Sequence, residues 1–389
     1  MRLLLVSPSG SYRTAAFLDA AGALGCEVAV ATDGPSAIPK ASLHVPFHDP
    51  DAAAERLVSV VDAMDGVVGT DGDAVAVAAA FGRRVGLASN SPAAMAAAGD
   101  KAAQRTGVGA AGVPQPEFAV VAGDDAAAWS TFPAVVKPLD RSASQGVLRV
   151  DGAAELAGAL RTVRGIVGKR APLLVESFLP GVEVIVEGLV RAGRMDVLAT
   201  FDKPDTPEGP TFPETLLVSP ARLGDAVTAR VVDVARRAVA AVGLNEGPVH
   251  VECKAAGEEV WFLELAARTI GGLCARALDD GGVSLEELVV RHALGLPLPP
   301  RRQTGATGVL MLPVGRSGRL AAVRGVDSAR AVEGVTGVII SIGPGQEVAA
   351  LPAGDRYLGF VFARAATPDA VESALRQAWA ALEVDITAS

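Results

Sequence analysis

Two glutamates in neighbouring apolar segments are the residues of this sequence best suited to bind a cation. Glu252 lies in the segment Val249–Lys254 and Glu264 in the segment Val260–Leu265, and the short interval between them is typical of a β-hairpin. Side chains alternate along a strand, so regular pairing places both carboxylates and His250 on one face. Close carboxylates repel unless a cation lies between them, and their oxygens suit Mg²⁺ bridged to phosphates. These residues alone leave open a sheet in which one glutamate faces solvent.

An arginine follows the second segment, and paired glycines follow the arginine. Arg268 comes shortly after Glu264 and precedes Gly271 and Gly272. A guanidinium just beyond a metal-binding strand can hold a carboxylate, or the charge that develops on a transferring phosphoryl group. Glycines let the backbone approach a ligand closely. A surface arginine beside an ordinary glycine turn stays open as the alternative.

A lysine ends another apolar segment and stands before a loop of small residues. Lys137 follows Ala134–Val136 and precedes Pro138, and the loop 141–146 reads Arg-Ser-Ala-Ser-Gln-Gly. A lone charge at the end of a buried strand is suited to nucleotide phosphates, and such a loop offers backbone donors that fold over them. An ordinary hairpin turn explains the loop equally well on its own.

Glu176 ends a further apolar strand, and Glu183 follows after Phe178-Leu179-Pro180-Gly181-Val182. A carboxylate with neighbouring backbone groups can bind an adenine edge, and a second carboxylate can accept hydrogen bonds from ribose hydroxyls. Exposed glutamates at strand ends are common, so this segment is ambiguous by itself.

The elements that position these residues form two units and a tail. The first ninety or so residues alternate apolar and amphipathic segments, which predicts a parallel sheet covered by helices: Leu3–Val6, Thr14–Leu24, Val28–Ala31, Ala52–Met64 and Gly66–Gly69. From about Asp100 the pattern changes and predicts these helices and strands: 101–106, a strand ending at 137, 146–150, 153–163, 172–176, 182–190 and 225–242, before the hairpin, which turns at 255–257. The tail after the Pro-rich segment 296–302 has strand-like segments at 308–312, 337–342 and 357–363, then a last helix.

Composition narrows the function classes. The 389 residues carry a formal net charge of −9 with acidic and basic residues interspersed, which argues against a nucleic-acid partner and favours small molecules. No apolar run is long enough to cross a bilayer, and the three scattered cysteines show neither disulfide nor metal spacing. We therefore expect a cytoplasmic enzyme without a membrane partner, and a homodimer as the default assembly.

Taken in order, these segments resemble the ATP-grasp superfamily, in particular its carboxylate-amine ligase branch, which includes the L-amino acid ligases. The resemblance runs from about Asp100 to Gly295 and implies an α/β and α+β multidomain fold. Its expected parts are an N-terminal pre-ATP-grasp α/β domain at 1–95, an ATP-grasp domain at 96–300 with a lid subdomain at about 110–178, and a C-terminal α+β segment at 301–389 that completes the catalytic half.

The resemblance also implies site residues. It assigns Arg268 and Lys137 to catalysis and the two glutamates, Glu252 and Glu264, to Mg²⁺, with Mn²⁺ as a second candidate. It assigns ATP binding to Lys101, Lys137, Ser142, Ser144, Gly146, Glu176, Phe178, Leu179, Glu183 and Leu263. It assigns the substrate pocket to Lys203, Glu214, His250, Arg268, Gly271 and Gly272. Many members have an asparagine where this chain has Ala266, so one metal ion is expected to be held less fully by protein.

The implied reaction joins a carboxylate to an amine, with an amino acid as substrate, through an acyl phosphate formed from ATP. Two alternatives remain at this point. One is a purine-pathway or carboxylase-type enzyme of the same superfamily that uses formate or bicarbonate. The other is a non-catalytic nucleotide-binding protein, for which Ala266 is the supporting feature.

Overall fold

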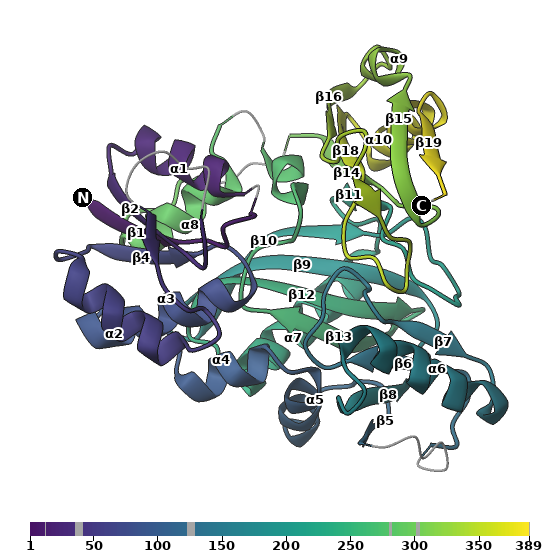
Figure 1. The fold of residues 1–389 in the computed structure, drawn as a ribbon, viewed down its shortest axis with the longest axis horizontal. Coiled ribbons are helices and arrows are strands. Elements are labelled where there is room, and N and C mark those ends of the chain that lie inside the picture. The colour runs from purple at the N-terminus through teal and green to yellow at the C-terminus, as the bar shows by residue number, and fades with distance from the viewer. Residues whose placement is uncertain (12, 36–41, 123–128, 280–281, 301–303, 389) are drawn as a thin grey trace.

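The protein is described by a computed structural model that covers residues 1–11, 13–35, 42–122, 129–279, 282–300 and 304–388. Figure 1 shows the N-terminal unit at one end, a long sheet through the middle and the C-terminal unit at the other end, with a smaller lid unit beside the sheet. Within the described ranges, no helix is both long and apolar enough to cross a membrane.

The N-terminal unit is the expected parallel sheet with helices. Four strands of the described chain pair in the order β3-β2-β1-β4, all parallel, with these bounds: β1 Arg2–Val6, β2 Glu27–Thr32, β3 Ser42–His44 and β4 Gly66–Gly69. Three helices accompany them: α1 Thr14–Ala23, α2 Pro50–Val60 and α3 Gly72–Val85. Residues 3–6 of β1 are fully buried, as a central parallel strand covered on both faces requires.

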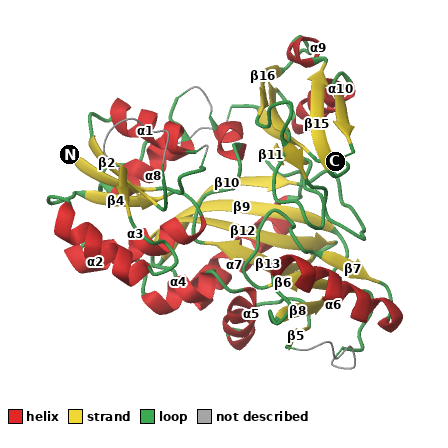
Figure 2. Cartoon of the chain, in the orientation of Figure 1, coloured by secondary structure: helices red, strands yellow, loops and turns green. Residues whose placement is uncertain are grey.

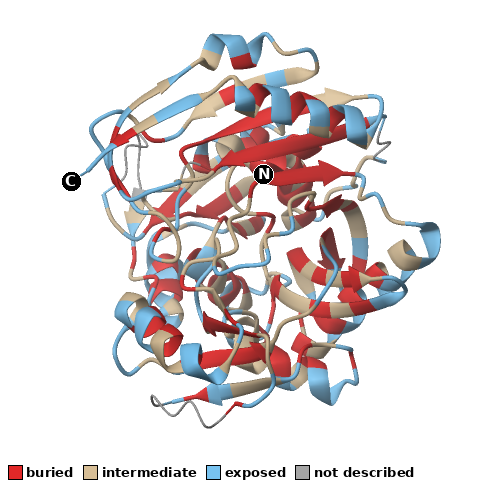
Figure 3. Cartoon of the chain, turned by 90° about the vertical axis from the view of Figure 1, so that its right-hand side faces the viewer, coloured by how far each residue is buried: buried red, intermediate tan, exposed pale blue. Residues whose placement is uncertain are grey.

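The central sheet joins the middle of the chain to its tail. Eight of the described strands pair in the order β13-β12-β9-β10-β11-β14-β18-β16, with these bounds: β9 Val182–Arg191, β10 Arg194–Asp202, β11 Leu216–Ser219, β12 Glu246–Ala256, β13 Glu259–Ala266, β14 Ala306–Leu312, β16 Val335–Ile340 and β18 Gly359–Ala365. Helix α7 (Asp225–Val242) has the predicted bounds, and its periodic Val and Ala residues pack on β12 and β13. Figure 3 shows the central strands buried and helices with one buried and one exposed face.

The lid unit is a small sheet with its own core. Its described strands pair antiparallel in the order β5-β8-β6-β7 and are covered by α6 (Ala153–Val167): β5 Phe118–Val121, β6 Ala134–Pro138, β7 Leu148–Val150 and β8 Leu173–Ser177. All of these elements fall within residues 110–178, the range predicted for the lid.

The C-terminal unit differs from the sequence prediction at its end. Helix α10 (Pro368–Ala380) packs on β14 and β18, but the described chain continues into a further strand. That strand belongs to a sheet of order β17-β15-β19, formed by β15 Gly318–Arg324, β17 Glu347–Val348 and β19 Glu383–Thr387, with α9 Val326–Arg330 after β15. These strands were not predicted, because they are short or have charged residues that interrupt an apolar pattern.

The junctions between the units are helical. The predicted division after residue 95 falls inside α4 (Pro92–Ala98), which α5 (Lys101–Ala110) follows almost at once. Helix α8 (Leu285–Ala293) lies within the range predicted for the ATP-grasp domain, yet it packs on α1 and β4 of the N-terminal unit. The predicted end of the catalytic core, 296–302, extends into residues 301–303, which are outside the described residues.

Candidate active site

The β12–β13 hairpin brings the two predicted metal glutamates together. Glu252 pairs directly with Glu264 across the strands, and His250 pairs with Ala266. Glu252, Glu264 and His250 line one cavity, so the expectation that the three side chains share a face is confirmed. Register shifts only beyond Glu252, toward the turn.

The hairpin turn itself was predicted one step too early. The sequence placed it at Ala255–Gly257, whereas Ala256 still pairs with Glu259 and the turn consists of Gly257 and Glu258. Gly257 has a φ of +60°, the left-handed conformation that short hairpin turns demand. The side chains of the carboxylate pair are unaffected, since they lie at the far end of the hairpin.

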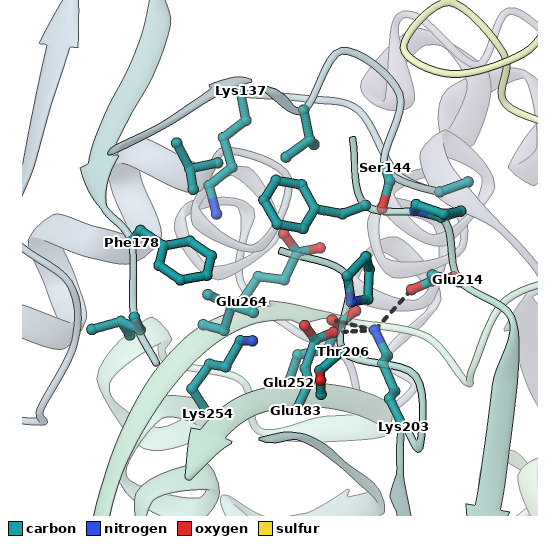
Figure 4. A pocket seen from close by; sticks show the side chains of 18 of the residues that line it. Lys137, Ser144, Phe178, Glu183, Lys203, Thr206, Glu214, Glu252, Lys254 and Glu264 are labelled. Carbon is teal, nitrogen blue, oxygen red and sulfur yellow. Dashed lines mark hydrogen bonds and ion pairs between the residues drawn. The ribbon is translucent and has the colours of Figure 1, made fainter. Parts of the chain in front are cut away.

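A buried lysine stands among three carboxylates beside this pair. Lys203 Nζ lies 3.0 Å from Glu214 Oε1 and 3.2 Å from Glu252 Oε2, and it also bonds Glu183. Figure 4 shows these side chains converging from separate strands and loops. Burial disfavours the charge of Lys203, but the three glutamates outweigh it and raise the pKa of the ammonium well above its ordinary value. Lys203 is therefore a cation at neutral pH, whereas burial raises the pKa of Glu183 in the same cluster.

His250 extends the cluster into the sheet. Its Nδ1 bonds the buried Glu187, and its Nε2 lies 3.1 Å from Glu252 Oε1. Burial disfavours the imidazolium, yet the charges of Glu187 and Glu252 raise the pKa of His250 to about 9. Burial likewise opposes the charge of Glu252, but Lys203 and His250 hold its pKa below the ordinary range. Glu252 is thus an ionised carboxylate at neutral pH.

Glu176 and Lys137 form a second buried ionic group in the lid. Arg105 Nη2 donates to Glu176 Oε2 at 2.8 Å, and Lys137 Nζ lies 2.5 Å from Glu176 Oε1. All three side chains are at most 5% exposed. Burial raises the pKa of Glu176, but the charges of Arg105 and Lys137 outweigh it, so the pKa lies below its ordinary value. The Arg105 guanidinium also donates to the Leu263 carbonyl oxygen at 2.6 Å, joining the lid to β13.

The small-residue loop after β6 is hydrogen-bonded to the C-terminal unit. The Gly146 N–H donates to the Pro352 carbonyl oxygen at 2.8 Å, and Gln145 Nε2 donates to the Ala353 carbonyl oxygen at 2.8 Å. Lys101 Nζ donates to the Arg141 carbonyl oxygen at 2.6 Å at the start of the loop. Ser142 and Ser144 of this loop line the cavity, and Figure 4 shows Ser144 there.

A cavity lined by residues of the lid and of the central sheet includes most of the predicted nucleotide residues in its lining. Phe178 is flanked by Phe212, with ring centroids 6.4 Å apart, and the Arg149 guanidinium lies 4.4 Å from the Phe178 ring centre. The predicted residues that line this cavity are Lys101, Lys137, Ser142, Ser144, Glu176, Phe178, Leu179, Glu183 and Leu263. Gly146 is the one predicted nucleotide residue outside the described lining. The lining combines apolar side chains, such as Phe178 and Leu263, with charged ones, such as Lys137 and Glu264, as binding a planar base with a phosphate chain requires.

A second cavity adjoins the first at the carboxylate pair. It is lined by residues from the N-terminal unit, the sheet and the tail: Asp71, Gly72, Lys101, Glu214, Leu217, His250, Glu252, Glu264, Arg268, Gly271, Gly272, Met311 and Tyr357 among others. Arg268 Nη1 donates to the Thr269 carbonyl oxygen at 2.9 Å, which holds its guanidinium at the cavity wall. Lys101, Glu252 and Glu264 line both cavities, so a molecule in each would meet at the carboxylates.

The carboxylates at this meeting point fit a divalent magnesium ion by their chemistry. Glu252 and Glu264 are opposed, and hard carboxylate oxygens are the ligands Mg²⁺ prefers. Lys101 Nζ lies 3.5 Å from Glu264 Oε2, so that carboxylate is contacted only loosely. Ala266, two residues after Glu264 on β13, has no side-chain atom that could bind a metal ion. Among the described residues, another group close enough to hold an ion comprises Glu183, Glu214 and Glu252, where Lys203 Nζ lies.

Sequence reasoning missed three residues that complete these groups. Arg105 lies one helical turn after Lys101 on α5, so helical spacing could have paired them. Glu187 is a charged residue inside the apolar strand β9, on the same face as Glu183, and this was a usable signal. The Tyr357 hydroxyl donates to Glu214 Oε2 at 2.8 Å. No local sequence signal pointed to Tyr357, because this contact joins residues far apart in the chain.

Two family models match the chain in the regions that build these cavities. A model described as ATP-grasp domain matches residues 130–277, and one described as L-amino acid ligase C-terminal domain 2 matches residues 310–387. The first match covers the carboxylate hairpin and the lid from β6 onward, and the second covers the tail that supplies Tyr357.

Other proteins are similar to this chain over most of its length. The chain is 29% identical over 306 residues to the uncharacterized protein y4rH of Sinorhizobium fredii, an alignment that covers 74% of this chain but 61% of that protein. An L-amino acid ligase from Bacillus licheniformis has the same fold, with a TM-score of 0.85 and 24% identity over 100% of this chain and 99% of that one. An N5-carboxyaminoimidazole ribonucleotide synthetase from Thermotoga maritima is similar at a TM-score of 0.76 and 18% identity over 100% of both chains. The chain thus carries an ATP-grasp domain followed by an L-amino acid ligase C-terminal domain, and it has the fold of an L-amino acid ligase.

Proposed function

We propose that the chain is a carboxylate-amine ligase that joins an amino acid to a second amine through an acyl phosphate, with release of ADP and phosphate. The observation that carries the proposal is the meeting of two cavities at one carboxylate pair: a cavity under the lid lined by most of the predicted nucleotide residues, and a second cavity lined by Arg268 and Glu214. Such an arrangement brings a γ-phosphate and a second substrate together at Glu252 and Glu264.

In this proposal the adenine lies against Phe178, Leu179 and Leu263, and Glu183 accepts from the ribose. The Ser142–Gly146 loop covers the phosphates. Lys101 and Lys137, which both line the cavity under the lid, neutralise the charge of the phosphates. Glu176 acts behind Lys137, because its two carboxylate oxygens hold Lys137 and Arg105 and so fix the position of the lysine.

Glu252 and Glu264 would hold Mg²⁺, with Mn²⁺ as a substitute. The ion supplies charge neutralisation on the phosphate oxygens when it is bound. Lys203 and His250 set the ionisation of Glu252, so this carboxylate is available as an anion throughout the neutral range. The missing side-chain ligand at Ala266 predicts weaker metal binding than in relatives with an asparagine there.

The first chemical step is attack of the substrate carboxylate oxygen on the γ-phosphorus, which breaks the bond to the leaving ADP. Arg268 and Lys137 stabilise the charge that develops on the transferring group. The amine nitrogen then attacks the acyl carbon, phosphate leaves with its electron pair, and the amine gives up a proton. Positioning and electrostatics supply the catalysis, so no covalent enzyme nucleophile is required.

The second cavity supports an amino acid as the acid. Glu214 is fixed by Tyr357 and Lys203, and one carboxylate held in this way can accept from a substrate ammonium group. Arg268 lies on the same cavity wall and can bind a carboxylate through its fork of donors. Leu217 and Met311, each 2% exposed, provide an apolar part of the wall for a side chain.

Release of ADP from Mg-ATP tests the proposal. A panel of amino acids is offered singly and in pairs, with formate and bicarbonate alongside, and Glu264→Gln serves as the inactive control. Release that depends on an amino acid and disappears in the control supports the ligase. Release that depends on formate or bicarbonate identifies the carboxylase-type alternative, and ATP binding without release under any condition identifies a non-catalytic protein.

A further inference from the structure

The backbone that carries Arg268 is held from two sides. On one side, the Ile270 N–H donates to Glu187 Oε2 of the central sheet at 3.0 Å. On the other, Arg13 Nη2 donates to Thr269 Oγ1, a contact between residues 256 positions apart. The Thr269 carbonyl oxygen in turn accepts from Arg268 Nη1 at 2.9 Å. Thr269 therefore connects the N-terminal unit to the guanidinium that faces the second cavity.

Arg13 is itself immobilised within the N-terminal unit. Its Nη1 donates to the Thr70 carbonyl oxygen at 2.9 Å and to Asp71 Oδ1 at 3.0 Å, and its guanidinium lies 5.7 Å from the Phe17 ring centre. The residue is 2% exposed. Because Nη1 is bonded and packing fixes the guanidinium, Nη2 of Arg13 points in one direction, toward Thr269.

The partner of Arg13 is fixed as well. Asp71 Oδ2 accepts from Ser11 Oγ at 2.6 Å and from Thr70 Oγ1 at 3.0 Å, so both carboxylate oxygens are bonded within the N-terminal unit. Asp71 also lines the second cavity, next to the segment that Arg13 contacts. Among the described residues that line this cavity, Arg268 is present but Arg13 and Thr269 are not. The contact between Arg13 and Thr269 therefore supports Arg268 from outside the cavity lining.

We propose that Arg13 is a positioning residue for the ligase reaction, acting through Thr269 to hold the Arg268 guanidinium where the acyl phosphate forms. The proposal rests on the proposed role of Arg268 in that reaction. It gives the N-terminal unit a part in the chemistry, although none of the described residues of that unit lines the first cavity. A small displacement of a group that stabilises the transition state lowers the rate strongly, whereas nucleotide binding at the distant end of the first cavity is unaffected.

Thr269→Val tests the link with little change in side-chain volume. The variant loses the hydroxyl that accepts from Arg13, while Thr269→Ser keeps it. We expect kcat to fall about tenfold or more in Thr269→Val with KM for ATP unchanged, and Thr269→Ser to restore most of the rate. Equal rates in the valine and wild-type proteins, or an equal loss in the serine variant, would overturn the proposal.

A double-mutant cycle separates positioning from general stability. If Arg13 and Thr269 act through Arg268, the loss caused by Thr269→Val disappears when Arg268 is already replaced by Gln. A purely structural contact would cause the same fold-loss in both backgrounds, and that result contradicts positioning. Arg2→Gln, which removes an exposed ion pair of the same unit, is the matched control and leaves kcat unchanged.

Amide hydrogen exchange gives a readout that needs no substrate. In Thr269→Val and Arg13→Gln, residues 266–272 are expected to exchange about tenfold faster than in the wild type, and residues of β9 at the wild-type rate. Unchanged exchange of 266–272 in both variants overturns the positioning role. Failure of the wild-type protein to release ADP with any acid overturns the ligase instead, so the two failures are distinguishable.

Discussion

Glu252 and Glu264 lie directly opposite each other on adjacent antiparallel strands. Like charges at such a position destabilise a sheet unless cations compensate them. In this protein Lys203 and His250 contact Glu252, and Lys101 lies 3.5 Å from Glu264. The pair is therefore held ionised at the junction of the two cavities, where a metal ion and phosphates would complete the compensation.

The first prediction concerns this carboxylate pair. Glu252→Gln or Glu264→Gln is expected to lower kcat by about 100-fold, or about 3 kcal/mol of transition-state stabilisation, because each removes a proposed anionic metal ligand. The matched control is Glu258→Gln at the exposed turn of the same hairpin, which should leave kcat unchanged. Steady-state ADP release over a range of Mg²⁺ concentrations measures both, and wild-type rates in the two site variants would contradict the assignment.

The second prediction concerns the buried ion group in the lid. Arg105→Met leaves Glu176 with one positive partner in place of two, and breaking a buried pair in this way costs about 3 kcal/mol or more of unfolding free energy. Because Arg105 no longer holds Glu176 in place, Glu176 no longer fixes the position of Lys137, and KM for ATP should rise as well. Urea unfolding and ATP titration check the two effects, and a variant as stable as the wild type would show that Arg105 does not hold Glu176.

The third prediction gives the sign of a pH effect. The pKa of Glu176 in the folded protein lies below the ordinary value of 4.5, since Arg105 and Lys137 outweigh its burial. Its contribution to stability is therefore complete above the unfolded-state pKa and is lost as the pH falls through the lower folded-state pKa. In Glu176→Gln, urea unfolding measured from pH 7 into the acid range should show a shallower loss of stability. Parallel curves for the two proteins would contradict this contribution.

The fourth prediction concerns the loop over the phosphates. Gly146 has a φ of +73°, and a Cβ there would lie 2.8 Å from Pro138 Cγ. Gly146→Ala is expected to lower kcat by about tenfold, because it displaces the loop and its hydrogen bond to the Pro352 carbonyl oxygen. It is also expected to lower the free energy of unfolding by about 1–2 kcal/mol, a loss too small to explain the fall in kcat by unfolding.

The control for that variant is Gly112→Ala, at a φ of +65° with open space around the added methyl group. It carries the same backbone strain outside the loop, so it should lose stability but keep kcat. Thermal melting and ADP release are measured on both proteins. Equal losses of activity in the two variants would show that the loop has no lid role.

Local patterns in the sequence predicted the elements that carry the proposed site. The helical period of Val and Ala defined α7 to its ends, and strand alternation placed His250, Glu252 and Glu264 on one face. Both signals arise from periodicity within a single segment, which a sequence displays directly. The N-terminal parallel sheet followed from the same kind of pattern.

Contacts between distant segments could not be predicted in this way. The bond between Tyr357 and Glu214 joins residues 143 positions apart, and the bond between Arg13 and Thr269 joins residues 256 apart. The periodicity of one segment does not identify the distant residue that it contacts. These hydrogen bonds depend on how whole units pack against each other. The short strands β15, β17 and β19 were missed for a related reason, since their partners rather than their own residues make them strands.

The acyl-phosphate route is the central claim, and transfer of an oxygen isotope tests it most directly. The chain is incubated with Mg-ATP, an amine and an amino acid found to support turnover, whose carboxylate carries ¹⁸O, and the released phosphate is analysed by mass spectrometry. Attack of the carboxylate on the γ-phosphorus, followed by displacement of phosphate by the amine, leaves one ¹⁸O in each phosphate. Unlabelled phosphate alongside amide product would contradict the acyl phosphate and with it the roles proposed for Arg268 and Lys137.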